Sequence, residues 1–111
     1  SFKNLNINRV YNRQIDSRVH IFTNLYFVNT KEMVDIFCEH GANLDFVHYI
    51  FNDRGEVMQS GTKMVFSAKS YQIGVYEALR DHGANPKIAD ERGVTAMELF
   101  DGADPTMTDE S

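Results

Sequence analysis

The sequence predicts a mainly α fold, in which pairs of short helices stack as a solenoid and extended β-hairpins connect the pairs. The first observation behind this prediction is a recurring motif, since residues 39–43 read EHGAN and residues 81–85 read DHGAN. The second is that each copy closes a run whose apolar residues share one helical face. The third is the strand-forming stretch that separates the copies, as a connection between stacked units would. We expect about two full repeats with partial units at both ends.

The composition is that of an ordinary globular domain. The 111 residues are 42% hydrophobic and 24% charged, close to globular averages, so residues 1–111 are treated as a single domain. Sixteen acidic and eleven basic side chains give a formal net charge of −5, which repels phosphate backbones. We therefore expect no nucleic-acid partner.

The only cysteine, Cys38, follows two apolar residues and cannot form an internal disulfide. A small apolar role for a lone cysteine is typical of a reducing compartment, which predicts a cytoplasmic protein. The chain has no apolar run of about 18 residues, the length that a spanning helix needs. Its amino end also lacks the charged and then apolar pattern of a signal peptide. We expect no membrane contact.

The amino-terminal part is interpreted as one connection followed by one helix pair. Residues 1–18 form a finger or the remnant of an upstream repeat. Residues 19–43 hold the helices, with a first helix over 19–28 and a second over 31–40. Gly41 can adopt the left-handed conformation that ends a helix. Because an upstream unit would cover the first pair, we expect the chain to be a piece of a longer one or to self-associate through this uncapped face.

An inserted β-hairpin is predicted at residues 44–61. Residues 46–51 (FVHYIF) are rich in strand formers, and residues 52–55 (NDRG) provide a turn before the chain returns. This connection is longer than the one between Gly83 and Thr95, so the extra length belongs to the hairpin.

The carboxyl-terminal part repeats the helix pair and then stops. Thr62 is a usable helix cap, and Gly83 ends the second helix as Gly41 does the first. Thr95 opens a similar segment that turns acidic before a second helix can form. The predicted segments are repeat helices at 62–85, a short finger at 86–94, a partial terminal helix at 95–101 and an acidic tail at 102–111.

Two stretches resemble the ankyrin repeat, namely residues 83–86 (GANP) and residues 90–96 (DERGVTA). The resemblance covers residues 19–100, most clearly from Thr62 onward. It implies helix pairs joined by finger hairpins, and a non-enzymatic role in binding another protein through the fingers and a concave helix face. The proline and histidine usual in the first helix are replaced by Lys63 and Val65 in one unit.

Candidate catalytic and metal-binding residues have simpler structural interpretations. His40 and His82 precede the helix-ending glycines, where a helix dipole favours positive charge. His20 and His48 lack a second ligand at a metal-binding spacing. No glycine-rich phosphate loop is present. We expect no catalytic residue, no cofactor and no metal.

The predicted partner-binding residues lie on the connections and the first helices. Large aromatic side chains on a connection that usually needs only a short polar turn indicate interface anchors or a packed hairpin, and both interpretations stay open. The resemblance to ankyrin repeats adds the variable positions of fingers and first helices. The set is Phe46, Tyr49, Phe51, Asp53, Arg54, Lys63, Lys69, Glu91, Arg92 and Val94.

Three alternatives accompany this hypothesis. An acidic inhibitor or immunity-type protein would cover a basic site on a target enzyme. A structural segment of a longer repeat array would have no ligand of its own. An enzyme would need a site at the hairpin base, built from Asp45, His48 and Glu56.

Overall fold

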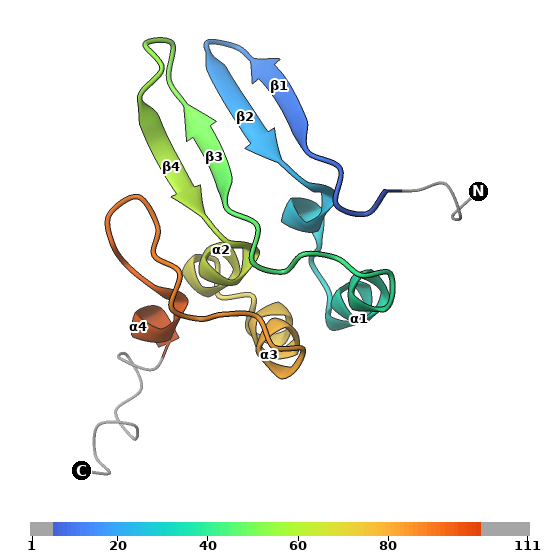
Figure 1. The fold of residues 1–111 in the computed structure, drawn as a ribbon. Coiled ribbons are helices and arrows are strands. Elements are labelled where there is room, and N and C mark those ends of the chain that lie inside the picture. The colour runs from blue at the N-terminus through green and yellow to red at the C-terminus, as the bar shows by residue number, and fades with distance from the viewer. Residues whose placement is uncertain (1–5, 101–111) are drawn as a thin grey trace.

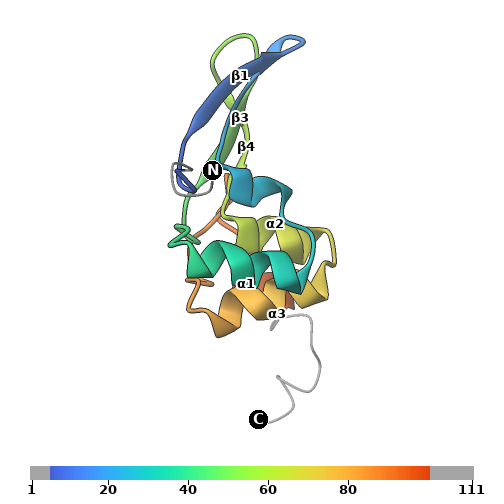
Figure 2. The ribbon, with the colours of Figure 1, turned by 90° about the vertical axis from the view of Figure 1, so that its right-hand side faces the viewer.

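The computed structural model describes residues 6–100, and in it a four-stranded antiparallel sheet stands on a layer of short helices (Figure 1). Figure 2 shows the strands rising away from the helices as an arm. The elements in chain order are β1 (Tyr11–Ile15), β2 (Arg18–Phe22), the 3-10 helix η2 (Asn24–Phe27), α1 (Lys31–Glu39), β3 (His48–Phe51), β4 (Val57–Gly61), α2 (Lys63–Lys69), α3 (Ile73–Asp81) and α4 (Ala96–Phe100).

The sheet consists of two hairpins joined side by side, in the order β1-β2-β3-β4. In the first hairpin, Ile15 pairs with Arg18 across a two-residue turn. Asp16 has φ 58° in this turn, a left-handed conformation that aspartate tolerates better than most residues. The hairpins join where β2 pairs with β3, from Val19 opposite Phe51 to Ile21 opposite Tyr49. The pairing therefore brings two segments about thirty residues apart into one surface.

The prediction of a mainly α helix-pair solenoid is wrong, because the structure is a small α/β fold with a four-stranded antiparallel sheet. Terms such as solenoid and ankyrin-type architecture do not describe it. The error lies mainly in residues 19–28, which we predicted as a helix and which form β2 and η2. Their apolar residues also fit a strand, and the partner β3 decides between the two by pairing, a long-range contact that overrides local spacing.

Other predicted segments form at or near their expected places. Strands β3 and β4 lie within residues 44–61, and helices α2 and α3 lie within residues 62–85. The predicted finger at 1–18 ends inside the first hairpin, which continues to Phe22. The acidic tail at 102–111 lies outside the described residues.

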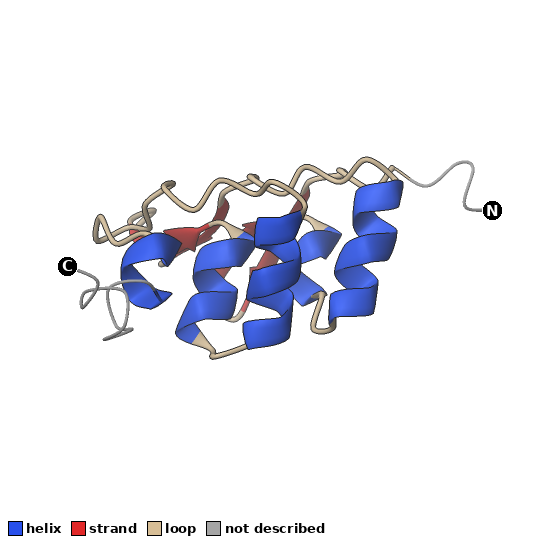
Figure 3. Cartoon of the chain, turned by 90° about the horizontal axis from the view of Figure 1, so that it is seen from below, coloured by secondary structure: helices blue, strands red, loops and turns tan. Residues whose placement is uncertain are grey.

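The helices lie side by side beneath the sheet, as Figure 3 shows from below. Helix α3 contacts both α1 and α2, and α2 also contacts α4. Their facing sides form one apolar core with η2. The fully buried apolar side chains at its centre are Leu25, Val28, Val34, Met64, Val65, Leu79 and Ala96.

Side chains and glycines fix where these helices begin and end. The Thr30 and Thr62 hydroxyls accept hydrogen bonds from the Met33 and Val65 amides, as helix caps do. Gly41 has φ 79° and Gly83 has φ 93°. In both places the next amide bonds back into the last helical turn, the pattern of a glycine-ended helix.

Helix α2 ends in the same way on a tyrosine. Tyr71 has φ 57° and is 78% exposed, so its side chain gains little from packing in a conformation that favours glycine. Tyr71→Gly should therefore raise the free energy of unfolding by about 1 kcal/mol, measured by urea unfolding.

Gly83→Ala serves as the matched control, because it puts a Cβ into the same conformation with no nearby atom to clash. It should lower the free energy of unfolding by a similar amount, about 1 kcal/mol. A Tyr71→Gly variant that is less stable than the wild type would show that the tyrosine makes a contact that holds the turn.

Candidate functional site

The sheet presents two faces, because successive side chains of a strand point to opposite sides. The Tyr49 face carries Val19, Ile21, Tyr49, Phe51 and Val57, which the strand register places together. The His48 face carries His20, Phe22, His48 and Ile50, and it turns toward η2 and α2, whose rings line a pocket with it.

The Tyr49 face is an aromatic and aliphatic surface that stays partly open to solvent. The Tyr49 and Phe51 rings stack on each other, with centroids 5.6 Å apart and planes 11° apart. Both rings are partly exposed, and Val57 beside them on β4 is exposed. Two predicted anchors thus lie together on an accessible surface.

A hollow of about 560 Å³ opens between the two hairpin tips at the end of this face. We call it the tip hollow. Among its lining residues, we call the apolar pair Val19 and Phe51 its floor and the acidic pair Asp16 and Asp53 its rim. Both aspartates are exposed and neither appears among the ion pairs of the described residues. The hollow therefore combines apolar contact area with a negative rim. Its remaining lining residues are Gln14, Ser17, Asn52 and Gly55.

Sequence reasoning identified only the β3 side of this site. Phe51 and Asp53 were predicted, whereas Asp16 and Val19 were not. A signal was present in the alternating residues around the Asp16–Ser17 turn, which is typical of a two-residue hairpin. Arg54 lies at the second tip, where its guanidinium pairs with Glu56 at 3.1 Å.

Lys63, another predicted contact residue, lies in the interior instead. It is 5% exposed, and its ammonium donates a hydrogen bond of 2.8 Å to the Tyr26 carbonyl. The ammonium also lies 5.7 Å from the centre of the Tyr26 ring, a favourable cation–π position. Burial lowers the pKa of Lys63 to about 8. Lys63 thus joins α2 to η2 and is not available to a partner.

His48 is buried next to this lysine, at 2% exposure. Its ring contacts those of Tyr26, Phe46 and Phe66, at centroid distances of 5.4, 5.0 and 6.3 Å. Burial, with a smaller contribution from the Lys63 charge, lowers the pKa of His48 to about 4. The imidazole is therefore neutral near pH 7. Phe46, a predicted anchor, packs against this ring.

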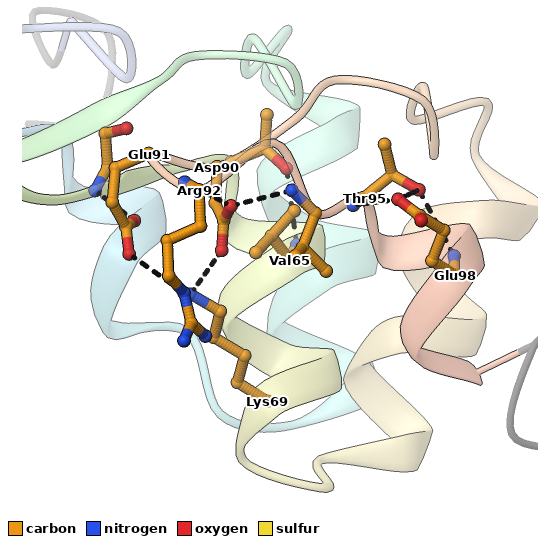
Figure 4. Close-up of polar contacts among 10 residues, drawn as sticks. Val65, Lys69, Asp90, Glu91, Arg92, Thr95 and Glu98 are labelled. Carbon is orange, nitrogen blue, oxygen red and sulfur yellow. Dashed lines mark hydrogen bonds and ion pairs between the residues drawn. The ribbon is translucent and has the colours of Figure 1, made fainter.

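The remaining predicted contacts lie on the loop around Asp90 or, in the case of Lys69, at the end of α2 against it (Figure 4). The Asp90 carboxylate is fully buried and accepts from the Arg92 and Val94 amides, at 2.8 and 2.9 Å. The Lys69 ammonium lies 2.7 Å from it. Burial alone would raise the pKa of Asp90, but these hydrogen bonds and the Lys69 charge lower it. Lys69 therefore fixes the loop.

Glu91, from the same loop, reaches the edge of the sheet. Its carboxylate accepts a 2.9 Å hydrogen bond from the Ser60 amide of β4, which occupies a donor that an edge strand would otherwise expose. The Arg92 guanidinium lies 3.7 Å from the Glu91 carboxylate, and its side chain is largely exposed. Val94 is partly exposed. Beyond the loop, Thr95 and Glu98 exchange the paired hydrogen bonds of a capping box at α4.

The residues of the alternative enzyme site are engaged separately. The Asp45 carboxylate accepts from the Asn85 amide at 2.8 Å, whereas Glu56 accepts from Asn52 within the second hairpin turn. His48 contacts neither through a hydrogen bond in the described part of the chain. Within residues 6–100 no group of three or more histidine, cysteine or acidic side chains is placed to hold a metal ion.

A second hollow, of about 280 Å³, lies beside α1. Phe27, Met33, Ile36 and Phe37 line it, and Phe27 and Ile36 are exposed. The self-association that we predicted through an uncapped face of the first helix pair stays a prediction.

No protein-family model matches the chain, and no curated protein matches it either. The resemblance of residues 83–86 and 90–96 to ankyrin repeats stays a prediction. Among the described residues, no helix is both long enough and apolar enough to cross a membrane.

The buried histidine predicts a pH-dependent stability. The unfolded chain binds a proton at His48 near pH 6.5, but the folded chain does so only near pH 4, so stability is lost as the pH falls through this window. The full contribution is about 3 kcal/mol. Urea unfolding across the window measures it, and His48→Phe should flatten the profile. If the free energy of unfolding of the wild type and of His48→Phe depends on pH in the same way, His48 is not the group responsible.

The Asp90 loop predicts a large cost for one substitution. Asp90→Ala leaves Lys69 unpaired and two amides without their acceptor, so the free energy of unfolding should fall by about 2–4 kcal/mol. Asp81→Ala is the control, since Asp81 is exposed and its ion pair with Arg80 is long, at 3.8 Å. Urea unfolding should show a change below about 0.5 kcal/mol for the control. An equal decrease in the free energy of unfolding of both variants would show that the contacts of Asp90 do not stabilise the fold more than an exposed ion pair does.

Proposed function

We propose that the chain is a non-enzymatic protein-binding module that docks a partner on the Tyr49 face and in the tip hollow. The observation that carries the proposal is the tip hollow itself, where an apolar floor lies under a negative rim. Stacked aromatic side chains continue from that floor along β3. Aromatic anchors surrounded by polar groups are typical of binding energy hot spots.

The hollow favours a basic side chain of the partner. The aliphatic stem of a lysine or arginine can lie on Val19 and Phe51 while its charged end meets Asp16 and Asp53. The net charge of −5 adds long-range attraction for a basic surface. The partner in this proposal is therefore a protein with an exposed lysine or arginine beside apolar residues.

An inhibitor that covers the basic site of an enzyme would use the same contacts, so it is a special case of this proposal. Absence of an enzymatic role is part of the proposal because Asp45 and Glu56 serve loop and turn structure. A cytoplasmic location is also proposed. It is supported by Cys38, whose thiol pKa is raised by burial and by Asp35, which makes it less reactive.

Reversing the rim charge should weaken binding of the partner. The immobilised wild type should retain a protein from source-cell lysate that the double variant Asp16→Lys, Asp53→Lys does not. After identification and purification, that protein should bind the variant at least about tenfold more weakly, measured by calorimetry. Its affinity for the wild type should also fall as salt increases.

The matched control carries the same charge change on α3, through Glu77→Lys and Asp81→Lys at exposed positions. It should bind like the wild type. Equal losses in both variants would show that overall charge, and not the tip hollow, attracts the partner. A third variant, Ile36→Asp, changes the hollow beside α1. If binding is lost in this variant alone, the interface lies at that hollow and the proposal is overturned.

A further inference from the structure

The two edges of the sheet differ in what covers them. Strand β4 forms one edge, where Glu91 from the loop around Asp90 occupies the outward Ser60 amide. Strand β1 forms the opposite edge (Figure 1), and among residues 6–100 it packs chiefly against β2. Every residue from Asn12 to Ile15 is exposed. The backbone of β1 therefore presents an open edge to solvent.

The register of the first hairpin shows which backbone groups of β1 are free at this edge. Ile15 and Arg18 close a two-residue turn, so they form a hydrogen-bonded pair, and such pairs alternate along an antiparallel ladder. Asn12 and Gln14 fall between these pairs, so their amides and carbonyls point away from β2. Carried across the sheet, the same alternation turns the Ser60 amide outward, as its bond to the neighbouring loop requires.

The open edge carries positive charge in an otherwise acidic chain. Arg13 lies at the middle of β1, and the guanidinium groups of Arg13 and Arg9 lie 5.2 and 5.5 Å from the centre of the Tyr11 ring. Neither arginine forms an ion pair within residues 6–100. Residues 1–15 contain three basic side chains and no acidic one, although the whole chain has a net charge of −5. A strand added at this edge therefore meets two arginines without an acidic partner.

This charge decides which kind of strand the edge favours. A second copy of the chain would add its own β1, and antiparallel pairing about the central residue would set Arg13 opposite Arg13, which is destabilising. A charged side chain on an edge strand is a common protection against such self-pairing. The same charge stabilises a strand that carries aspartate or glutamate opposite the arginine. The edge thus disfavours a second copy and favours an acidic segment.

We propose that β1 binds an extended acidic segment of another protein as a fifth, antiparallel strand. The backbone of the segment exchanges hydrogen bonds with Asn12 and Gln14. One carboxylate of the segment lies opposite Arg13, and a second, two residues toward the carboxyl end of the segment, lies near Arg9. Opposite Ile15, which is 50% exposed, an apolar side chain fits. The pattern of the segment is therefore apolar-x-acidic-x-acidic.

The test uses a fluorescein-labelled peptide, Ser-Val-Thr-Glu-Thr-Glu-Ser, which has this pattern. Its binding to the full chain is followed by fluorescence anisotropy, and the Asn12 and Gln14 amides are followed by NMR. We expect saturable binding and slower hydrogen exchange of both amides. A second peptide carries an N-methyl group on each threonine, which removes the backbone donors that face β1 but keeps the charge. It should bind at least about tenfold more weakly, the effect of two lost hydrogen bonds.

Variants of the chain separate the charge from the backbone contacts. Arg13→Glu should weaken binding of the first peptide at least about tenfold. Lys87→Glu is the matched control, because it makes the same charge change at an exposed position between α3 and α4, and it should bind like the wild type. Asn12→Pro removes one outward amide and leaves the bonds between β1 and β2 in place. It should also weaken binding.

Several results would overturn the proposal. One is no saturable binding up to about 1 mM peptide, and others are equal affinity for the two peptides or unchanged binding in Arg13→Glu. Shifts of the β1 amides that depend on chain concentration without peptide would assign the edge to a second copy instead. The proposal does not rest on the tip hollow. The double variant Asp16→Lys, Asp53→Lys should still bind the peptide, so failure at one site can be distinguished from failure at the other.

Discussion

The fold depends on one buried cation, the ammonium of Lys63. It lies at the start of α2, where the helix dipole disfavours positive charge, and no carboxylate pairs with it in the described part of the chain. Its partners are the Tyr26 carbonyl, near the carboxyl end of η2, and the Tyr26 ring. Because a short 3-10 helix leaves such carbonyls without internal donors, the lysine satisfies an acceptor that would otherwise be orphaned. This contact fixes η2, and thereby the start of the layer beneath the sheet.

The same ammonium contributes to the state of His48, which is set mainly by burial. An ammonium already occupies the interior beside it, so a second positive charge there is disfavoured by both burial and repulsion. The imidazole stays neutral and keeps both donor and acceptor character. Burial is therefore the main cause of the neutral imidazole, and the Lys63 charge reinforces it while the same ammonium connects α2 to η2.

Local signals placed α1, α2, α3 and the second hairpin, but they predicted a helix where β2 and η2 lie. Thr62 and Gly83 act on residues within a few positions, so their effect on α2 and α3 can be read from neighbours in the chain. The first hairpin could not be recognised in the same way, because β2 is defined by pairing with β3 about thirty residues later. The residues of the tip hollow also differ in how well the sequence predicted them. Phe51 stands on a strand with clear local signals, whereas its neighbour Val19 comes from the strand that was misjudged.

Lys63 and Lys69 show a second limit of sequence reasoning. Both were expected at a surface, since long charged side chains are rarely buried. Each instead reaches an acceptor from a distant segment, the Tyr26 carbonyl in one case and Asp90 in the other. Whether a lysine finds such an acceptor depends on three-dimensional neighbours that no spacing rule describes.

The register of the sheet has a thermodynamic consequence for any occupant of the tip hollow. The two tips belong to separate hairpins, which pair with each other through β2 and β3, and this pairing ends at Val19 and Phe51 on the floor of the hollow. An occupant that contacts both tips therefore closes a bridge across the junction. Binding of the partner and pairing of β2 with β3 then become linked equilibria. The partner stabilises the pairing of the two hairpins, and any change that weakens this pairing also weakens binding of the partner.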